Sequence, residues 1–231
     1  MAVDLATVRA ICDRLGHDES LLVLPAVFTG MRWGEVCGLR RSLLTLPPAR
    51  GKESPASGWY EIDPLVGAVH EDVHSRRYFG PPKGGRGRVV DLPPFLVERL
   101  RRHIEAMGER GLLFPDTHGQ PRRHTDWLRT WRPACDGRPA RFTSGGGTLL
   151  PAVPPVCWGL RFQDLRHTHK TMLIELGIPD ILQDERLGHR PAGVQGVYAH
   201  SSPAMHAQLT AGLQRIWEQR QPRPVPNRRL R

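Results

Sequence analysis

The sequence is poor in lysine, in paired cysteines and in long apolar runs, and each shortage excludes a class of protein. Among its 231 residues are 33 lysines and arginines, but the lysines are only Lys52, Lys83 and Lys170. The four cysteines lie far apart with no C-x-x-C pair, which argues against a zinc ribbon and a secreted disulfide framework. No apolar run approaches membrane-spanning length, and the start of the chain does not resemble a signal peptide. We therefore expect a cytoplasmic protein with no membrane partner.

Positive charge is what the chain has in excess. Its formal net charge is +10, from 33 basic and 23 acidic residues. This imbalance favours a polyanionic partner, nucleic acid before an acidic membrane surface, while charge that serves only solubility is an alternative. Arginine binds phosphate oxygens through a planar fork, which suits DNA, although a coding bias toward arginine explains the same count.

Hydrophobic periodicity predicts a mostly helical chain with one small sheet. Helical spacing of apolar residues predicts helices over residues 4–15, 20–30, 33–44, 94–107, 124–134, 164–176, 179–187, 191–199 and 203–219. Short strand-like runs within residues 59–92 predict a meander with a turn near Lys83, and residues 111–114 predict one more strand. Residues 137–157, rich in glycine and proline, are expected to form a surface loop.

One pattern, H-E-x-x-H at residues 70–74, matches that of zinc metalloproteases. Its mechanism needs a helix, so that both histidines share one face a turn apart. Here Gly67 precedes the pattern, Val66, Ala68 and His70 alternate, and Tyr78 follows closely. The context indicates strand and turn, so we exclude the zinc site.

Two other clusters of charged residues could carry chemistry. In the first, Arg32 stands at the predicted start of a helix with Glu35 three residues later, and the acid is placed to hold the arginine, although a surface ion pair explains the same spacing. The second is QDLRHTHK at residues 163–170, which by itself could be a metal site, a nucleic-acid contact or a solvated helix face. Intervals of 23 and nine residues then separate Arg166, His189 and Tyr198.

Taken in order, these stretches resemble the conserved boxes of the tyrosine recombinase (phage integrase) family. That family carries T-G-x-R-x-x-E-x-x-x-L, then H-x-L-R-H-T, then L-G-H, then a nucleophilic tyrosine, commonly in Y-x-H. The matching stretches begin at Thr29, Gln163, Leu187 and Tyr198, and GLRFQDLRHTHK also resembles actinobacterial-type integrases. The resemblance implies an α+β, mostly helical catalytic domain over residues 1–219 with a small antiparallel β-meander. We expect the basic, proline-rich residues 220–231 to be a disordered tail.

The resemblance implies site-specific DNA recombination or integration, by cleavage and rejoining of double-stranded DNA through a 3′-phosphotyrosine. Tyr198 would be the nucleophile, and no ATP is implied because the intermediate conserves the phosphodiester energy. Arg32 and Arg166 would bind the non-bridging phosphate oxygens, and His189 would donate a further hydrogen bond. No metal or other cofactor is implied, because the arginines supply the electrostatic stabilisation.

Lys83 matches the family's lysine on the turn of the small sheet, which protonates the departing 5′-oxygen. The run from Pro82 to Pro93 also resembles the family's P-K-[ST]-…-R-x-[VI]-P-[LI] pattern, with Gly84 in place of the hydroxyl residue. A lysine in an exposed turn is the alternative explanation.

Two departures from the family pattern bear on activity. Gln163 stands where the family has histidine or lysine, and since an amide cannot exchange a proton near neutral pH, we expect slowed but not abolished cleavage. The first box begins at Thr29, which leaves no room for the family's N-terminal core-binding domain, so we expect weak, salt-sensitive DNA binding. His167, His169 and Lys170 are expected to pack or to touch the DNA backbone.

Several alternatives stay open at this point. The chain is an active strand-transfer enzyme, or a truncated, weakly active or inactive integrase remnant that binds DNA, or an enzyme that relaxes DNA as type IB topoisomerases do. The resemblance implies a homotetramer on DNA, in which residues 203–219 pack on a neighbouring protomer, but packing on their own domain explains their apolar stripe equally well. Binding to DNA would place the protein at the nucleoid.

Overall fold

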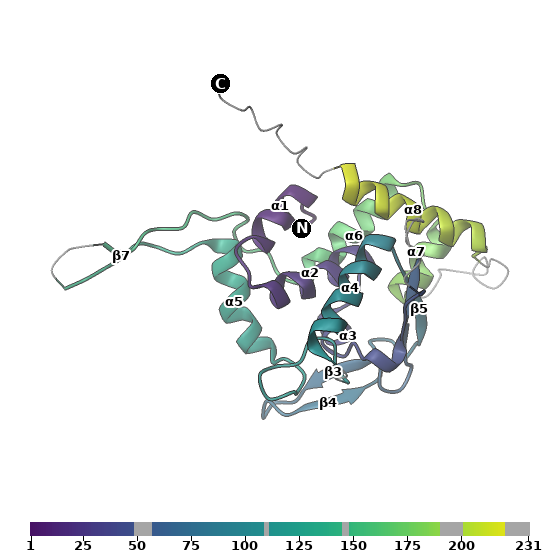
Figure 1. Cartoon of the computed structure of the whole chain (residues 1–231), viewed down its shortest axis with the longest axis horizontal. Coiled ribbons are helices and arrows are strands. Elements are labelled where there is room, and N and C mark those ends of the chain that lie inside the picture. The colour runs from purple at the N-terminus through teal and green to yellow at the C-terminus, as the bar shows by residue number, and fades with distance from the viewer. Residues whose placement is uncertain (49–56, 109–110, 145–147, 190–200, 220–231) are drawn as a thin grey trace, which may run out of the picture.

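The computed structural model describes residues 1–48, 57–108, 111–144, 148–189 and 201–219 (Figure 1). Its helices are α1 (Leu5–Cys12), α2 (His17–Thr29), α3 (Trp33–Cys37), α4 (Pro94–Met107), α5 (His124–Asp136), α6 (Asp164–Glu175), α7 (Asp180–Leu187) and α8 (Pro203–Gln219), with a short 3-10 helix η1 (Arg41–Leu43). Its strands are β1 (Leu44–Thr45), β2 (Gly58–Ile62), β3 (Ala68–Glu71), β4 (Arg77–Gly80), β5 (Arg88–Leu92), β6 (Arg141–Phe142) and β7 (Thr148–Leu150). The mostly helical α+β class is confirmed.

Helix α2 is the centre of the core, because its residues from Leu21 to Thr29 are all buried. A helix that is apolar on every side must be surrounded, and α2 packs against α1, α3, α4, α6 and β5. Gly30 ends α2 in the left-handed conformation, at φ 69°, which glycine adopts without steric cost. A Cβ atom there would lie 2.6 Å from the Leu187 side chain and 2.8 Å from that of His169, so glycine also permits the close approach of α6 and α7.

The strands between residues 44 and 92 form two antiparallel sheets. Strands β1, β2 and β5 make a three-stranded sheet in which β2 lies between the other two, and β3 pairs with β4 in a separate hairpin. The antiparallel pairing predicted for this region is confirmed, but β5 pairs with β2 rather than following β4 in a single meander. The turn after β4 carries Lys83, which is exposed.

Most predicted helices are confirmed to within a few residues, and residues 191–199 lie outside the described part of the chain. The helix predicted over residues 33–44 is wrong beyond Cys37, because long-range pairing replaces it. The Leu113 amide donates to the Leu39 carbonyl at 2.8 Å, and the Arg41 amide to the Gly111 carbonyl at 2.9 Å. Those same bonds leave residues 111–114 as a single bridge to Arg40 rather than a strand.

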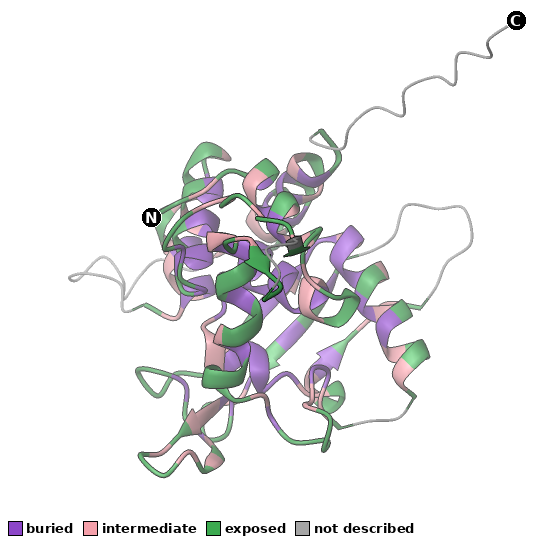
Figure 2. Ribbon diagram, turned by 90° about the vertical axis from the view of Figure 1, so that its left-hand side faces the viewer, coloured by how far each residue is buried: buried purple, intermediate pink, exposed green. Residues whose placement is uncertain are grey.

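Residues 137–157 contain the hairpin β6–β7, which projects from the body beside α5 (Figure 1), where the sequence predicts only a loop. Buried residues lie on the inward-facing sides of the helices and exposed residues on their outward-facing sides (Figure 2). No helix in the described ranges is long and apolar enough to cross a membrane.

Helix α8 packs on its own domain. Leu209, Leu213 and Trp217 are buried, and the Trp217 ring stacks on Phe95 of α4 with centroids 4.4 Å apart. Such an aromatic pair stabilises by roughly 0.5–1.5 kcal/mol beyond the burial of its area. The buried face of α8 is therefore covered by its own domain in this single chain, where α8 lies beside β5 and α4 (Figure 1).

Candidate active site

The first part of the site is the turn between α2 and α3, which carries Arg32. Arg32 is the N-cap residue of α3, and its backbone amide donates to Glu35 Oε2 at 2.9 Å. The Arg32 guanidinium lies 3.4 Å from Glu35 Oε1, so the contact that the sequence suggests is present. The Glu35 carboxylate therefore holds both the backbone and the side chain of Arg32.

A second arginine, Arg88 of β5, binds the same carboxylate from the other side. Its Nη1 and Nη2 atoms lie 3.1 Å and 2.8 Å from the two Glu35 oxygens, and its Nε donates to the Arg186 carbonyl at 2.8 Å. Burial raises the pKa of the Glu35 carboxyl, but hydrogen bonds and charge from Arg88 and Arg32 outweigh this effect, so the net pKa lies below its usual value. Glu35, with 1% of its side chain exposed, is a buried carboxylate kept ionised by two arginines.

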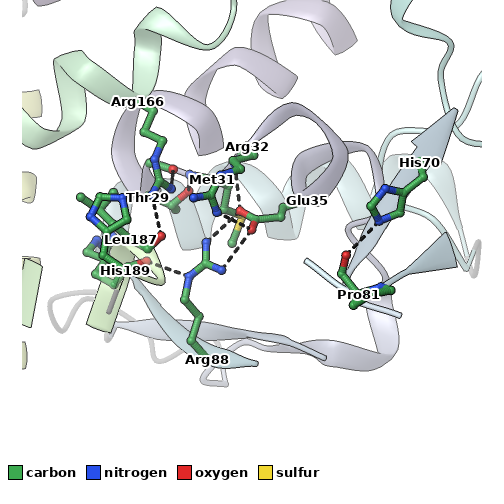
Figure 3. A network of polar contacts seen from close by, with 12 residues as sticks. Thr29, Met31, Arg32, Glu35, His70, Pro81, Arg88, Arg166, Leu187 and His189 are labelled. Atoms are coloured by element: carbon green, nitrogen blue, oxygen red, sulfur yellow. Dashed lines mark hydrogen bonds and ion pairs between the residues drawn. The ribbon is translucent and has the colours of Figure 1, made fainter. Parts of the chain in front are cut away.

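Arg166, on α6, lies beside this pair (Figure 3). Its Nη1 donates to the Gly30 carbonyl at 2.6 Å, and its Nη2 to the Leu187 carbonyl at 2.5 Å. Burial, with repulsion from Arg32 and Arg88, lowers the pKa of Arg166 to about 10, while Glu35 acts in the opposite direction. The guanidinium stays protonated at neutral pH, so the site holds three cations and one carboxylate and carries excess positive charge.

His189, just after the left-handed Gly188 that ends α7, completes the group. The Arg166 Nη2 atom lies 2.9 Å from His189 Nε2, and because a guanidinium only donates, this nitrogen is an acceptor and carries no proton. The other ring nitrogen lies 3.5 Å from Asp184 Oδ1. Burial and the charge of Arg166 lower the pKa of His189 below its usual value, so the ring is neutral at pH 7. Donation from Nε2 to a phosphate, as the family pattern implies, requires this nitrogen to gain a proton.

Behind the site lies a buried pair that the sequence did not indicate. Arg186 of α7 is fully buried, and its Nη2 donates to the carbonyls of Phe28 and Asp91, at 2.8 and 2.9 Å. Its Nε donates to His169 Nε2 at 2.9 Å. Burial and the Arg186 charge keep the pKa of His169 well below its usual value, so His169 is a neutral packing residue. No sequence signal pointed to Arg186, whereas Arg88 lay in the R-x-V run that follows Lys83 and could have been found from it.

The remaining predicted site residues are either exposed or lie outside the part of the chain that the structure describes. Lys83 is exposed in a turn closed by the Gly85 amide, which donates to the Pro82 carbonyl at 2.8 Å. Gln163 is exposed at the start of α6, and its side chain makes no capping bond there. Tyr198 lies outside the described residues. Arg32 with Glu35, Arg166, and His189, from three separate stretches of sequence, are thus brought together.

The H-E-x-x-H pattern does not form a metal site. His70 and Glu71 belong to strand β3, where they pair with Tyr78 and Arg77 of β4. The His70 Nε2 atom lies 2.8 Å from the Pro81 carbonyl oxygen in the same hairpin (Figure 3). Successive strand residues point to opposite faces, so the one-turn spacing of a zincin helix is missing, as the sequence context indicates.

Comparisons with known proteins agree with this architecture. No family model matches the chain. A prophage phiRv2 integrase of Mycobacterium tuberculosis is 26% identical over 200 residues, which are 85% of this chain and 46% of that protein, so the chain spans about half the length of the curated relatives it matches. Among solved structures, the Tn1549 transposon integrase in complex with transposon right end DNA aligns with a TM-score of 0.56 at 14% identity, over 90% of this chain and 64% of that one.

The XerA recombinase aligns with a TM-score of 0.50 at 16% identity, over 96% of this chain and 64% of that one. At these identities the two structures show a shared fold, and the integrase adds a likeness in sequence. The chain thus resembles the tyrosine recombinase (phage integrase) family in sequence and has the fold of its catalytic domain.

Proposed function

We propose that residues 1–219 are the catalytic domain of a tyrosine-type site-specific recombinase, which cleaves and rejoins double-stranded DNA in recombination or integration. The observation that carries this proposal is the convergence of Arg32, Arg166 and His189 on one point of the surface of α2, α6 and α7. The site holds three guanidinium groups, two of which bind one carboxylate, and this leaves positive charge for a phosphodiester, whose oxygens match arginine forks. The net charge of +10 and the structural likeness to an integrase solved with DNA support DNA as the partner.

In this proposal Arg32 and Arg166 bind the two non-bridging oxygens of the scissile phosphate. Their fixed positions matter because charge develops on these oxygens as the phosphorus becomes five-coordinate, and donors that are already placed need no reorganisation. Glu35 holds Arg32 in place rather than touching DNA. Binding of phosphate would also release Arg166 Nη2 from His189 Nε2.

The cleavage step conserves every atom. The Tyr198 oxygen attacks phosphorus, the bond from phosphorus to the 5′-oxygen breaks, and Lys83 gives that oxygen a proton. We assign the phenol proton to Nε2 of His189, because this nitrogen is an acceptor and the Gln163 amide cannot take a proton. Rejoining reverses each transfer, with a 5′-hydroxyl as the nucleophile.

The proposal extends to assembly and place in the cell. We propose that the protein acts on DNA as a homotetramer, within the cytoplasm at the nucleoid, and that the basic residues 220–231 form a tail outside the catalytic domain. Since Leu209, Leu213 and Trp217 of α8 are buried in its own domain, the tetramer would use surfaces other than that face of the helix.

A covalent-adduct assay tests the function. The 231-residue chain is incubated with a labelled pool of nicked DNA duplexes that carry a randomised stretch, and SDS-resistant protein–DNA adducts are isolated and sequenced. We expect an adduct that disappears in Tyr198→Phe and falls at least 100-fold in Arg166→Ala. Salt-dependent DNA retention without an adduct would instead indicate a DNA-binding remnant. Relaxation of supercoiled plasmid without strand exchange would indicate a topoisomerase-like enzyme.

A further inference from the structure

In the proposed function, Arg32, Glu35, Arg88, Arg166 and His189 form the phosphate-binding group. Four side chains outside this group form a chain of hydrogen bonds. His206 of α8 lies with Nδ1 2.6 Å from Asp91 Oδ2 of β5 and with Nε2 2.9 Å from Ser201 Oγ. The Ser201 hydroxyl also contacts Glu185 Oε2 of α7. We call Asp91, His206, Ser201 and Glu185 the serine relay.

The serine relay contains the Asp–His–Ser order of a hydrolase triad, but its hydrogen bonds do not fit a nucleophilic serine. Three hydrogen bonds need three protons, and the hydroxyl supplies one. If Ser201 donates to the Glu185 carboxylate, both ring nitrogens of His206 must donate, one to Asp91 and one to Ser201. A nucleophilic serine would instead have to give its proton to an unprotonated His206 nitrogen. Because its hydroxyl donates to Glu185, Ser201 is fixed in position and is not a nucleophile.

Glu185 connects the serine relay to the phosphate-binding group. Glu185, Arg186 and Leu187 are consecutive residues in the last turn of α7, and each holds a different part of the site. The Glu185 carboxylate contacts Ser201, the Arg186 carbonyl accepts from Arg88, and the Leu187 carbonyl accepts from Arg166. This one helical turn therefore fixes the position of Ser201 relative to both Arg88 and Arg166.

Asp91 of β5 also helps to fix the position of Ser201. Its side chain binds His206, while its backbone carbonyl accepts from the buried Arg186 Nη2 at 2.9 Å. Ser201 is therefore tied to α7 directly and to β5 through His206. In the sequence Ser201 stands three positions after Tyr198.

We propose that Ser201 is a positioning residue, which the serine relay holds so that the chain following Tyr198 is placed relative to the bound phosphate. This inference rests on the proposed DNA cleavage. Its action is on the attack by Tyr198 and not on phosphate binding, because the contacts of Ser201 and those of Arg32 and Arg166 are separate. A displacement of about 1 Å of an attacking group costs on the order of 100-fold in rate.

The test separates the attack by Tyr198 from the rest of the chemistry. Adduct formation on the nicked duplex pool requires Tyr198. Joining of a DNA strand bearing a 3′-(4-nitrophenyl phosphate) to a 5′-hydroxyl strand does not, because nitrophenol takes the place of the tyrosine. For Ser201→Ala we expect adduct formation to slow by about 10- to 100-fold, with joining unchanged within about twofold. Ser201→Thr, which keeps a hydroxyl, should restore most of the rate.

Ser202→Ala is the matched control. The Ser202 hydroxyl accepts from the Met205 amide at 3.3 Å, within the first turn of α8, and takes no part in the serine relay. Its adduct formation should remain at the wild-type rate. The double variant Ser201→Ala, His206→Gln should be no slower than the slower single variant, because both changes break one relay.

Each further outcome is decisive. Wild-type adduct formation by Ser201→Ala, or an equal loss of adduct formation and joining, would overturn the positioning role while leaving the proposed function standing. If the wild-type chain neither forms an adduct nor joins strands, the proposed function fails and this inference falls with it. Hydrolysis of 4-nitrophenyl acetate that disappears in Ser201→Ala would show that Ser201 is a nucleophile and would also overturn the proposal. A thermal melt of each variant checks folding, and His206→Gln replaces Ser201→Ala if that variant does not fold.

Discussion

Replacement of Arg88 by methionine is the sharpest perturbation of the site, because Arg88 is the main partner of a buried carboxylate. The Arg88 and Glu35 side chains are 7% and 1% exposed and share two hydrogen bonds, at 2.8 and 3.1 Å. Removal of one member of a buried ion pair leaves an uncompensated charge and costs about 3–5 kcal/mol of folding free energy. The contact with Arg32 persists, so we expect Arg88→Met to lose about 3 kcal/mol, at the lower end of that range.

Urea unfolding at pH 7, followed by circular dichroism, measures this loss. The control is the double variant Glu35→Gln, Arg88→Met, which removes the buried charge together with its partner. Since replacing both members of a buried pair is often nearly neutral, the double variant should be more stable than Arg88→Met. Equal or additive losses would refute the view that the cost comes from an unpaired Glu35 carboxylate.

The loss of stability in Arg88→Met should depend on pH in a predictable direction. In the wild type the pKa of Glu35 lies below its usual value of about 4.5, so the pair contributes stability above that pH and loses it as pH falls through the lower, folded-state pKa. Without Arg88, burial dominates and the folded-state pKa of Glu35 rises. The difference in stability between wild type and Arg88→Met should therefore be largest near neutral pH and should narrow as the pH falls below about 5. A difference that stays constant down to pH 4 would contradict this account.

Three further predictions concern the proposed DNA cleavage. Gln163→His should accelerate adduct formation by roughly 10- to 100-fold, because a histidine can accept the phenol proton; an unchanged rate would show that this position does not matter. Lys83→Ala should slow adduct formation at least 100-fold on ordinary DNA but far less on DNA with a 5′-bridging sulfur, a leaving group that needs no proton, and equal losses on both substrates would exclude Lys83 as the acid. Because the pKa of His189 is lowered by burial and Arg166, its neutral form persists through pH 7, and the adduct rate should fall only as the pH drops below about 6.5. His189→Asn should be slower and should lose this dependence between pH 5 and 8; a profile unchanged by the substitution would remove His189 from the proton transfer.

Some elements could be predicted from the sequence, whereas others could not. Helix α6 was predictable because Leu165, Met172 and Leu173 repeat at helical spacing and Gly177 follows the stripe, so the information is local. Helix α3 was predicted too long, because the bonds that end it come from residues 111–113, which no local pattern reveals. The sheet β1–β2–β5 likewise depends on long-range pairing, because β2 pairs with β5 although the hairpin β3–β4 lies between them in the chain.

The sequence by itself determined which side chains are candidates for chemistry, because the intervals between Arg32, Arg166, His189 and Tyr198 are properties of the chain alone. It also indicated that Glu35 serves Arg32, since residues three apart at a helix start are neighbours in any fold. Only the tertiary structure decided what holds those groups. Arg88 of β5 meets Glu35 of α3, and Ser201 meets Glu185 of α7, because the fold brings these elements together. Such contacts join residues 16 to 53 positions apart, and their geometry depends on the packing of whole elements rather than on any spacing along the chain.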